Sequence, residues 1–211
     1  MARRLAKVKR RRGRPDASFS ARHQILMGAA QAFGLKGFGK TSVEDVLEAS
    51  GVSRRTFYRM FGSKDELFEE LYEAASMLFL QSMKNAVDLG RTPEEKLGNC
   101  IELYLRTPLN VGPVFQVLQI ESSRPGTKLY ARREAILESL VDMLAQGFRE
   151  NQGRDIDPLI LRGIIAAHER IALHVFNTSP GDEAAIQRAK AAMLHIAGSA
   201  LGHIDSAAAG E

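Results

Sequence analysis

Apolar side chains recur at helical spacing along almost the whole chain after Asp16. Between residues 18 and 35, the apolar positions fall on one face of an α-helix, and the same spacing returns in most later segments. No segment shows the sustained alternation of apolar and polar residues, bounded by turn signals, that is typical of a strand. The pattern therefore predicts an all-α fold.

Start and stop signals divide this pattern into about nine helices. Thr41 with Glu44 predicts a capping box at the start of the second helix, and Gly51 ends that helix. Ser53 is predicted to cap the third helix, and Ser63 to start a long fourth helix over residues 64–88. Later helices are expected near residues 94–106, 111–122, 128–150, 158–177 and 182–203, with breaks that include Thr107-Pro108 and Pro125-Gly126.

Residues 41–66 hold two short helical patterns joined by Gly51-Val52-Ser53. Glycine suits such a turn, because a left-handed backbone costs a residue with a Cβ roughly 1 kcal/mol or more. With Phe57 and Phe61 facing inward, the outward side chains are Arg54, Arg55, Tyr58 and Arg59. Arginine can contact guanine O6 and N7 together, which is worth roughly 1–3 kcal/mol of discrimination. This arrangement favours a DNA-reading helix-turn-helix over a solvated basic helix.

The segments that carry a family resemblance are Thr41 to Val46, Gly51-Val52-Ser53, Thr56-Phe57-Tyr58 and Phe61 to Phe68. Together they resemble the N-terminal domain of the TetR (tetracycline repressor-like) family of bacterial transcription regulators, over about residues 20–70. The resemblance implies that phosphates are held by Thr41, Thr56, Tyr58 and Lys64, and that bases are approached by Arg54, Arg55 and Arg59. Ser42, beside Thr41, is expected among the DNA-contacting residues.

Positive charge is concentrated at the N-terminus. Residues 1–14 contain 8 of the 29 basic residues and no acid, whereas residues 65–211 carry 14 bases and 21 acids. Within this arm, Arg10, Arg11, Arg12 and Arg14, followed by Pro15, resemble the Arg-Gly-Arg-Pro element of minor-groove binders. The alternative is a solvated tail that raises non-specific affinity through counterion release. Under either interpretation the arm helps to hold DNA.

The last two predicted helices are unusually apolar. Residues 158–177 are apolar on nearly every side, so that helix needs cover on both faces. The last helix presents small and apolar residues, namely Ile186, Ala189, Met193, Ile196, Ala197, Ala200 and Leu201. We expect these helices to form a homodimer interface as a four-helix bundle. The alternative is a core formed entirely within one chain.

Six residues of the acidic C-terminal part are candidates for lining an effector pocket: Tyr104, Phe115, Gln119, Met143, Phe148 and His168. For any one of them, a place in the ordinary core is the stronger interpretation, because Met and aromatic residues at helical spacing usually pack inside.

Several other classes of protein are disfavoured. The single cysteine, Cys100, excludes an internal disulfide framework and fits a reducing cytoplasm. No apolar run approaches the roughly 18 residues of a membrane span. His168-Glu169 lacks the second histidine of a zinc protease, since Ala172 stands at that position. No nucleophile elbow or phosphate loop appears, so we expect neither an enzyme nor a metal or cofactor.

The sequence therefore predicts a cytoplasmic, nucleoid-associated regulator. Its expected parts are a basic disordered arm (1–17), a helix-turn-helix domain (18–64), an effector-binding and dimerisation domain (65–204) and a disordered tail (205–211). The expected function is sequence-specific DNA binding, as a repressor released from a palindromic operator by a small molecule. The alternative is an effector-independent activator or organiser of the same fold.

Overall fold

The computed structural model describes residues 17–208, and this part of the chain consists of nine helices without a strand. Their bounds are α1 Ala17–Lys36, α2 Val43–Ser50, α3 Arg54–Met60, α4 Lys64–Leu89, α5 Pro93–Val111, α6 Val114–Ser122, α7 Lys128–Gln152, α8 Pro158–Thr178 and α9 Glu183–Ala208. The prediction of an all-α fold is confirmed.

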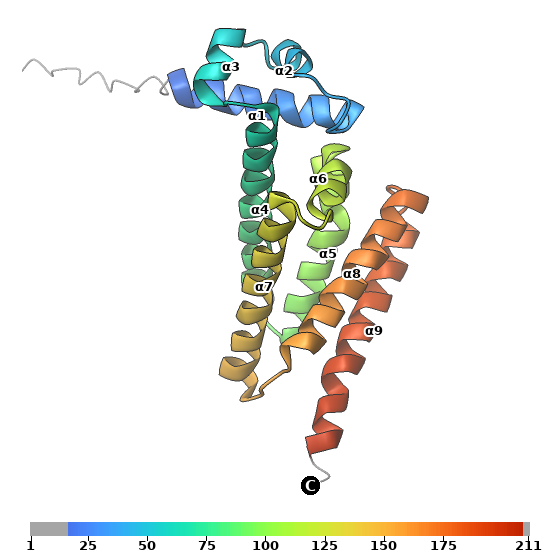
Figure 1. Cartoon of the computed structure of the whole chain (residues 1–211). Helices are drawn as coiled ribbons and strands as arrows, with labels where there is room; N and C mark the ends of the chain where they lie inside the picture. Colours follow the sequence, from blue (N-terminus) through green and yellow to red (C-terminus); the bar gives the residue numbers. More distant parts are fainter. Residues whose placement is uncertain (1–16, 209–211) are drawn as a thin grey trace, which may run out of the picture.

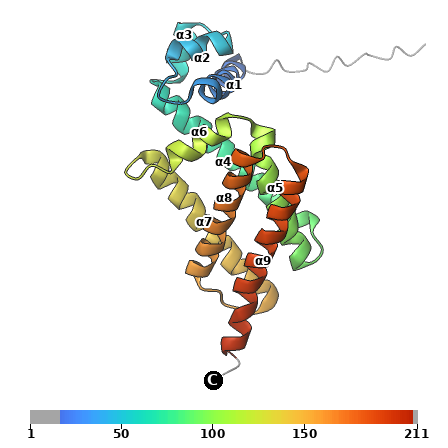
Figure 2. The ribbon, with the colours of Figure 1, turned by 90° about the vertical axis from the view of Figure 1, so that its right-hand side faces the viewer.

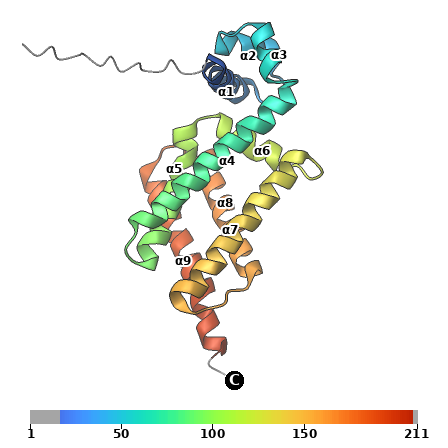
Figure 3. The same cartoon turned by 90° about the vertical axis from the view of Figure 1, so that its left-hand side faces the viewer.

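The helices form a small module at one end of an elongated body. Helix α1 lies across the top of Figure 1 with α2 and α3 above it, and α4 runs from this module along the side of the body. Helices α5 to α9 make up most of the body, with α8 and α9 side by side at its edge (Figures 1 and 2). Figure 3 shows α4 crossing the other face beside α7.

One core holds the module together. Ile25 and Phe33 of α1, Val46 of α2, and Phe57 of α3 are all 0% exposed, and Phe68 of α4 packs with them. Phe33 meets Phe68 edge to face, at 4.9 Å between ring centroids. This core also includes Val114, Leu118 and Leu129, which come from the start of α6, its middle and the start of α7. The module is therefore packed onto the body rather than tethered to it.

The body is held by two smaller cores. The first lies between α5, α8 and α9, and consists of Ile101, Leu105, Ala172, Ile186, Ala189 and Met193. The second consists of Val141 of α7, Ile156 of the following loop and Leu161 of α8. Met193 and Ala197, which we expected on the dimer interface, are 0% and 1% exposed within the single chain. That expectation was wrong, because this face of α9 packs on α5 and α8.

Two local expectations are also corrected. The N-cap of α2 is Ser42 rather than Thr41, and its capping-box partner is Asp45 rather than Glu44. Helix α5 does not break at Thr107-Pro108 but continues to Val111. Pro108 lies in the last turn, where it is buried, and Gly112 ends the helix with a φ of 81°. A proline near a helix end forfeits one backbone hydrogen bond, and here the ring gains a buried place.

The structure covers most of the C-terminal end of the chain but not the basic N-terminal arm. Helix α9 continues to Ala208, so residues 205–208 are helical rather than part of a tail. The arginines at positions 10, 11, 12 and 14 lie outside the described residues. Within residues 17–208, none of the helices combines the length and apolar character that crossing a bilayer would require.

Candidate nucleic-acid interface

The turn between α2 and α3 has the geometry that its sequence predicts. Gly51 has a φ of 68°, in the left-handed region, and its N–H donates to the Leu47 carbonyl at 2.9 Å. Ser53 then caps α3 by accepting a hydrogen bond from the Thr56 N–H at 3.1 Å. These two bonds set the direction of α3, so its outward face is fixed relative to the module.

Helix α3 has an apolar side and a basic side. Phe57 and Phe61 are 0% and 1% exposed within the core. Arg55 and Arg59 are exposed on the opposite side, as is Tyr58, whose ring meets Phe57 edge to face at 5.2 Å. The contact with Phe57 holds the tyrosine ring, and Tyr58 as a whole is 49% exposed. A basic helix face of this kind suits an anionic duplex.

Arg54 is exposed but already engaged. Its guanidinium forms an ion pair with Glu44 of α2, and both side chains are more than half exposed. An exposed pair of this kind contributes little to stability, roughly 0–1 kcal/mol. DNA can therefore replace Glu44 as the partner of Arg54 at a small energetic cost.

One of the expected phosphate-binding residues, Thr41, lies inside the module instead. Thr41 is 2% exposed, and its Oγ1 lies 2.7 Å from the Gly37 carbonyl and 3.2 Å from the Ala32 carbonyl. The expectation that the Thr41 side chain touches a phosphate is corrected, because burial keeps the hydroxyl from the surface. Thr56 is half-buried, and its hydroxyl lies 2.9 Å from that of Ser53. Ser42 is exposed beside them.

Lys64 acts as an internal clamp. Its ammonium donates to the carbonyls of Phe38 and Thr41, each at 2.8 Å, and lies 4.5 Å from the centre of the Phe38 ring. The first turn of α4 is thereby fixed to the loop between α1 and α2. The N-terminal position of this lysine suggested a phosphate contact, but the two carbonyls occupy two of its three N–H donors.

Sequence reasoning missed the ion pairs that brace the module. Arg22 of α1 donates to Glu70 of α4, with one contact at 2.6 Å, and its guanidinium lies 4.8 Å from the Phe61 ring centre. The hydrogen bond with Glu70 raises the pKa of Arg22. Lys36 pairs with Asp45 at 2.7 Å, and this contact, together with the Ser42 N–H, lowers the pKa of Asp45 to about 2. No helical spacing could reveal these pairs, since 48 residues separate Arg22 from Glu70, and the loop between α1 and α2 separates Lys36 from Asp45.

The six effector-pocket candidates lie in different surroundings. The side chains of Tyr104 and Gln119 are hydrogen-bonded to each other, and burial raises the pKa of Tyr104. Phe115 packs on Phe176, and Phe148 packs against the core around Val141. Met143 is exposed, whereas the His168 Nε2 lies 3.0 Å from the Met193 carbonyl. The structure thus brings Tyr104 and Gln119 together.

Ionisable groups cluster at the centre of the body. Arg133 of α7, which is largely buried, pairs with Glu169 of α8 at 2.5 Å. Tyr72 of α4 is hydrogen-bonded to Ser76 and to the fully buried Ser122, and burial raises its pKa. Within the described residues, no three or more His, Cys, Asp or Glu side chains gather as a metal would require.

Comparisons with known proteins agree with this geometry. Residues 25–71 match the family described as bacterial regulatory proteins, tetR family. The HTH-type transcriptional repressor AcnR of Corynebacterium glutamicum is 30% identical over 112 residues, which are 50% of this chain and 60% of AcnR. The chain thus spans about three fifths of the length of that relative.

Solved structures extend the likeness to the body. The regulator PfmR of Thermus thermophilus is 28% identical with a TM-score of 0.59, over 82% of this chain and 96% of PfmR. A TetR-like regulator from a Rhodococcus species is 23% identical with a TM-score of 0.69, over 86% and 96% of the two chains. The second likeness shows the fold alone.

Proposed function

The chain belongs to the tetR family of bacterial regulatory proteins, and on that premise we propose that it represses transcription by binding operator DNA as a homodimer. The observation that carries this proposal is α3, whose buried phenylalanines fix a face bearing Arg55, Tyr58 and Arg59 to the outside. Residues 18–64 form the DNA-binding part of this proposal, and residues 65–204 form the effector-binding and dimerisation part.

Each side chain of the interface has a proposed task. Arg55 and Arg59 approach base edges in the major groove, where arginine contacts guanine through two N–H groups. Arg54 joins them after releasing Glu44. The hydroxyls of Ser42, Thr56 and Tyr58 contact phosphates, and such contacts fix the register without reading the sequence. Lys64 contributes by positioning α4 and the preceding loop.

The basic arm adds affinity in this proposal. Arg10, Arg11, Arg12 and Arg14 lie in a segment of eight positive charges without an acid. These charges release counterions from DNA, and an arginine in a narrow minor groove gains further from its negative potential.

Dimerisation uses the faces of α8 and α9 that the single chain leaves exposed. On α8 these are Leu159, which is 73% exposed, and the small residues Gly163 and Ala166. On α9 they include Ala191, Ala192, Gly198 and Gly202. Small side chains let two helices approach closely, and a twofold axis gives both copies the same cover. The homodimer therefore keeps the two helices expected from the sequence but uses the opposite face of α9.

Release by a small effector acts through the spacing of the two copies of α3. Two recognition helices can dock together only when their separation matches half-sites about one helical turn apart. The module is packed on the body through Val114 and Leu118, so a change in the body moves α3. A differential affinity of the effector for the two arrangements supplies the energy. The effector-independent alternative predicts operator affinity that no metabolite changes.

The test is operator selection from a random DNA library, followed by affinity measurements. Arg55→Ala and Arg59→Ala should each relax preference at particular positions, by about 1–3 kcal/mol if the contact is bidentate. Arg91→Ala, an exposed arginine in the loop after α4, is the matched control and should leave the preference unchanged. If the selected sequences are the same for both α3 variants as for the wild type, α3 does not read the bases.

A further inference from the structure

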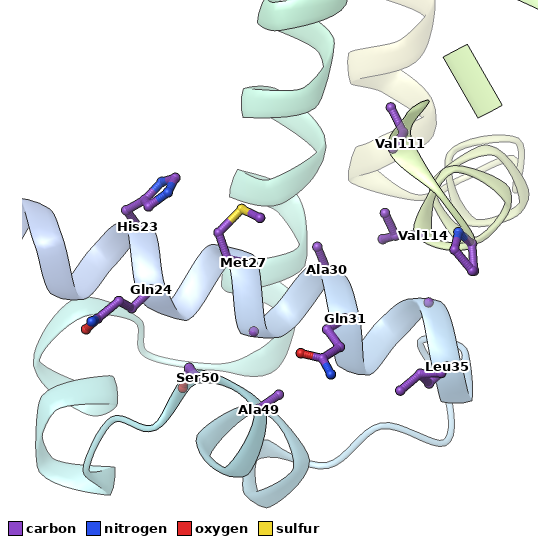
Figure 4. Close-up of a pocket in the computed structure, with 13 residues that line it drawn as sticks. His23, Gln24, Met27, Ala30, Gln31, Leu35, Ala49, Ser50, Val111 and Val114 are labelled. Atoms are coloured by element: carbon purple, nitrogen blue, oxygen red, sulfur yellow. The ribbon is translucent and has the colours of Figure 1, made fainter. Parts of the chain in front are cut away.

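A groove of about 620 Å³ lies along α1, between the end of α2 on one side and the junction of α5 and α6 on the other (Figure 4). One wall is α1 with Ala49 and Ser50 at the end of α2, and the other is the junction of α5 and α6 with Val111, Pro113 and Val114. Its volume falls within the roughly 300–1,000 Å³ that is typical of pockets for small ligands. The groove lies between the two proposed domains and includes none of the six effector candidates.

Two glycines of α1 bring these walls together. A Cβ on Gly28 would lie 2.6 Å from the Ser50 backbone, and one on Gly34 would lie 3.0 Å from the Val114 backbone N. Helix α1 therefore touches α2 at one point and α6 about two turns later. Between and beside these contacts, Met27 and Ala30 point towards the junction of α5 and α6, and Gln31 points towards the side of α2 (Figure 4).

The lining of the groove has no formally charged side chain. No Asp, Glu, Lys or Arg is among its 13 residues, although 26% of the whole chain is charged. Met27 is 59% exposed, Leu35 75% and Val111 44%, so three large apolar side chains border the hollow in contact with water. The polar groups are the amides of Gln24 and Gln31, the Ser50 hydroxyl and the His23 imidazole. A charged ligand would find no strong counter-charge there, whereas a neutral one would cover the apolar surface.

We propose that this groove binds an uncharged, mainly apolar small molecule whose few polar atoms bond with the two glutamine amides. A ligand in contact with both walls favours the arrangement in which the walls are this close. Because one wall belongs to the DNA-binding module and the other to the body, occupancy changes the affinity for operator DNA. This regulatory consequence rests on the proposed function, but binding in the groove does not.

The first experiment measures binding of N-phenyl-1-naphthylamine, a neutral apolar fluorescent probe, to the full chain. The double variant Met27→Gln with Leu35→Gln removes the exposed apolar border of the groove. The matched control is Met77→Gln with Leu78→Gln, which changes the same residue types at 64% and 71% exposed positions of α4. Both variants keep the charge of the wild type and alter only exposed side chains, so folding and electrostatic attraction to DNA are preserved.

We expect saturable binding of one probe per chain, weakened at least about tenfold in the groove variant and unchanged in the control. Equal binding by all three proteins, or the absence of saturable binding to the wild type, would overturn the proposal. Sedimentation of the same proteins tests the competing possibility that a second copy of the chain occupies the groove. An oligomer that dissociates only in the groove variant would assign the groove to a second copy of the chain instead.

The second experiment separates the groove from the proposed function. Without probe, the groove variant and the wild type should bind operator DNA equally. With probe, operator affinity should change in the wild type and the control but not in the groove variant. Loss of operator binding in all proteins would refute the proposed function and leave the probe result standing. Equal responses to probe in all three would refute the regulatory role of the groove.

Discussion

The DNA-binding module and the body are both helical, yet they are held together differently. The module has one continuous core dominated by phenylalanine, namely Phe33, Phe57, Phe61 and Phe68, and its short helices are capped at defined residues. The body divides its apolar contacts between two smaller cores, and many of its side chains are half-buried. A recognition surface requires a fixed geometry. A domain that responds to a ligand requires alternative conformations of similar free energy.

The largest effect we expect comes from the module core. Phe57→Ala should lower the free energy of unfolding by about 3–5 kcal/mol, because the removed ring leaves a cavity among close-packed side chains. Phe148→Ala in the body is the matched change, and its smaller loss should reflect a half-buried side chain. Urea unfolding of both variants measures the difference. Equal losses would show that the two regions are packed alike.

The next effect concerns the exposed faces of α8 and α9. Ala191→Glu should weaken dimerisation by roughly 3 kcal/mol or more, since it would bury a charge without a partner between two copies. Ala131→Glu, at an exposed position of α7, is the control and should leave the dimer intact. Sedimentation velocity at several concentrations gives the dissociation constants. A wild-type protein that stays monomeric at micromolar concentration would remove the basis for this interface.

A second substitution on α9, Met193→Glu, tests whether the other face of this helix is internal to one chain. Because Met193 is 0% exposed within one chain, the charge should unfold the body rather than dissociate a dimer. Circular dichroism distinguishes the two outcomes, since a dissociated but folded monomer keeps its helical signal. A soluble, helical monomer would place Met193 at the interface after all.

The difference between the regions also explains what the sequence could predict. In the module, the signals were local: Gly51 and Ser53 define the turn, and Phe57 with Phe61 defines the inward face of α3. In the body, proline and glycine predicted most helix ends. Pro108 is the exception, because it lies in the last turn of α5 and does not end the helix. What covers the apolar face of α9 could not be predicted. The spacing of Met193 and Ala197 indicates that this face is buried, but not whether α5 and α8 of the same chain or a second copy cover it.

The candidate interface shows the same limit. The outward direction of Arg55 and Arg59 followed from helical spacing alone. The burial of Thr41 and the contact of Lys64 with two carbonyls depend on the path of the loop from Gly37 to Thr41, for which no periodicity gives a rule. Local spacing predicts which side of a helix is exposed, but not which polar side chains fold back onto the backbone.

A smaller effect is expected at the turn. Gly51→Ala should destabilise the chain by about 1–2 kcal/mol, because alanine is strained at a φ of 68°. Gly98→Ala is the opposite case, since it lies in the interior of α5 and its Cβ would meet only the Lys190 Cε at 3.9 Å. There alanine should stabilise by about 0.5–1 kcal/mol through its higher helix propensity. Thermal unfolding of both variants checks the two signs, and a gain at position 51 would contradict the left-handed turn.

The smallest effect is a pH dependence that belongs to the body. Burial lowers the pKa of His168 below its ordinary value of 6.5, despite the hydrogen bond to the Met193 carbonyl. The unfolded chain therefore binds a proton at a higher pH than the folded chain does, and folding stability falls as the pH drops below 6.5. His168→Asn should flatten this part of the profile, measured as the urea midpoint between pH 7.5 and 5.5 (about one unit on either side of the ordinary histidine pKa). The matched change His195→Asn, at an exposed position of α9, leaves His168 in place and should keep the wild-type slope. An unchanged slope in the His168 variant would mean that other groups govern acid sensitivity in this range, and that α8 and α9 tolerate a charged imidazole between them.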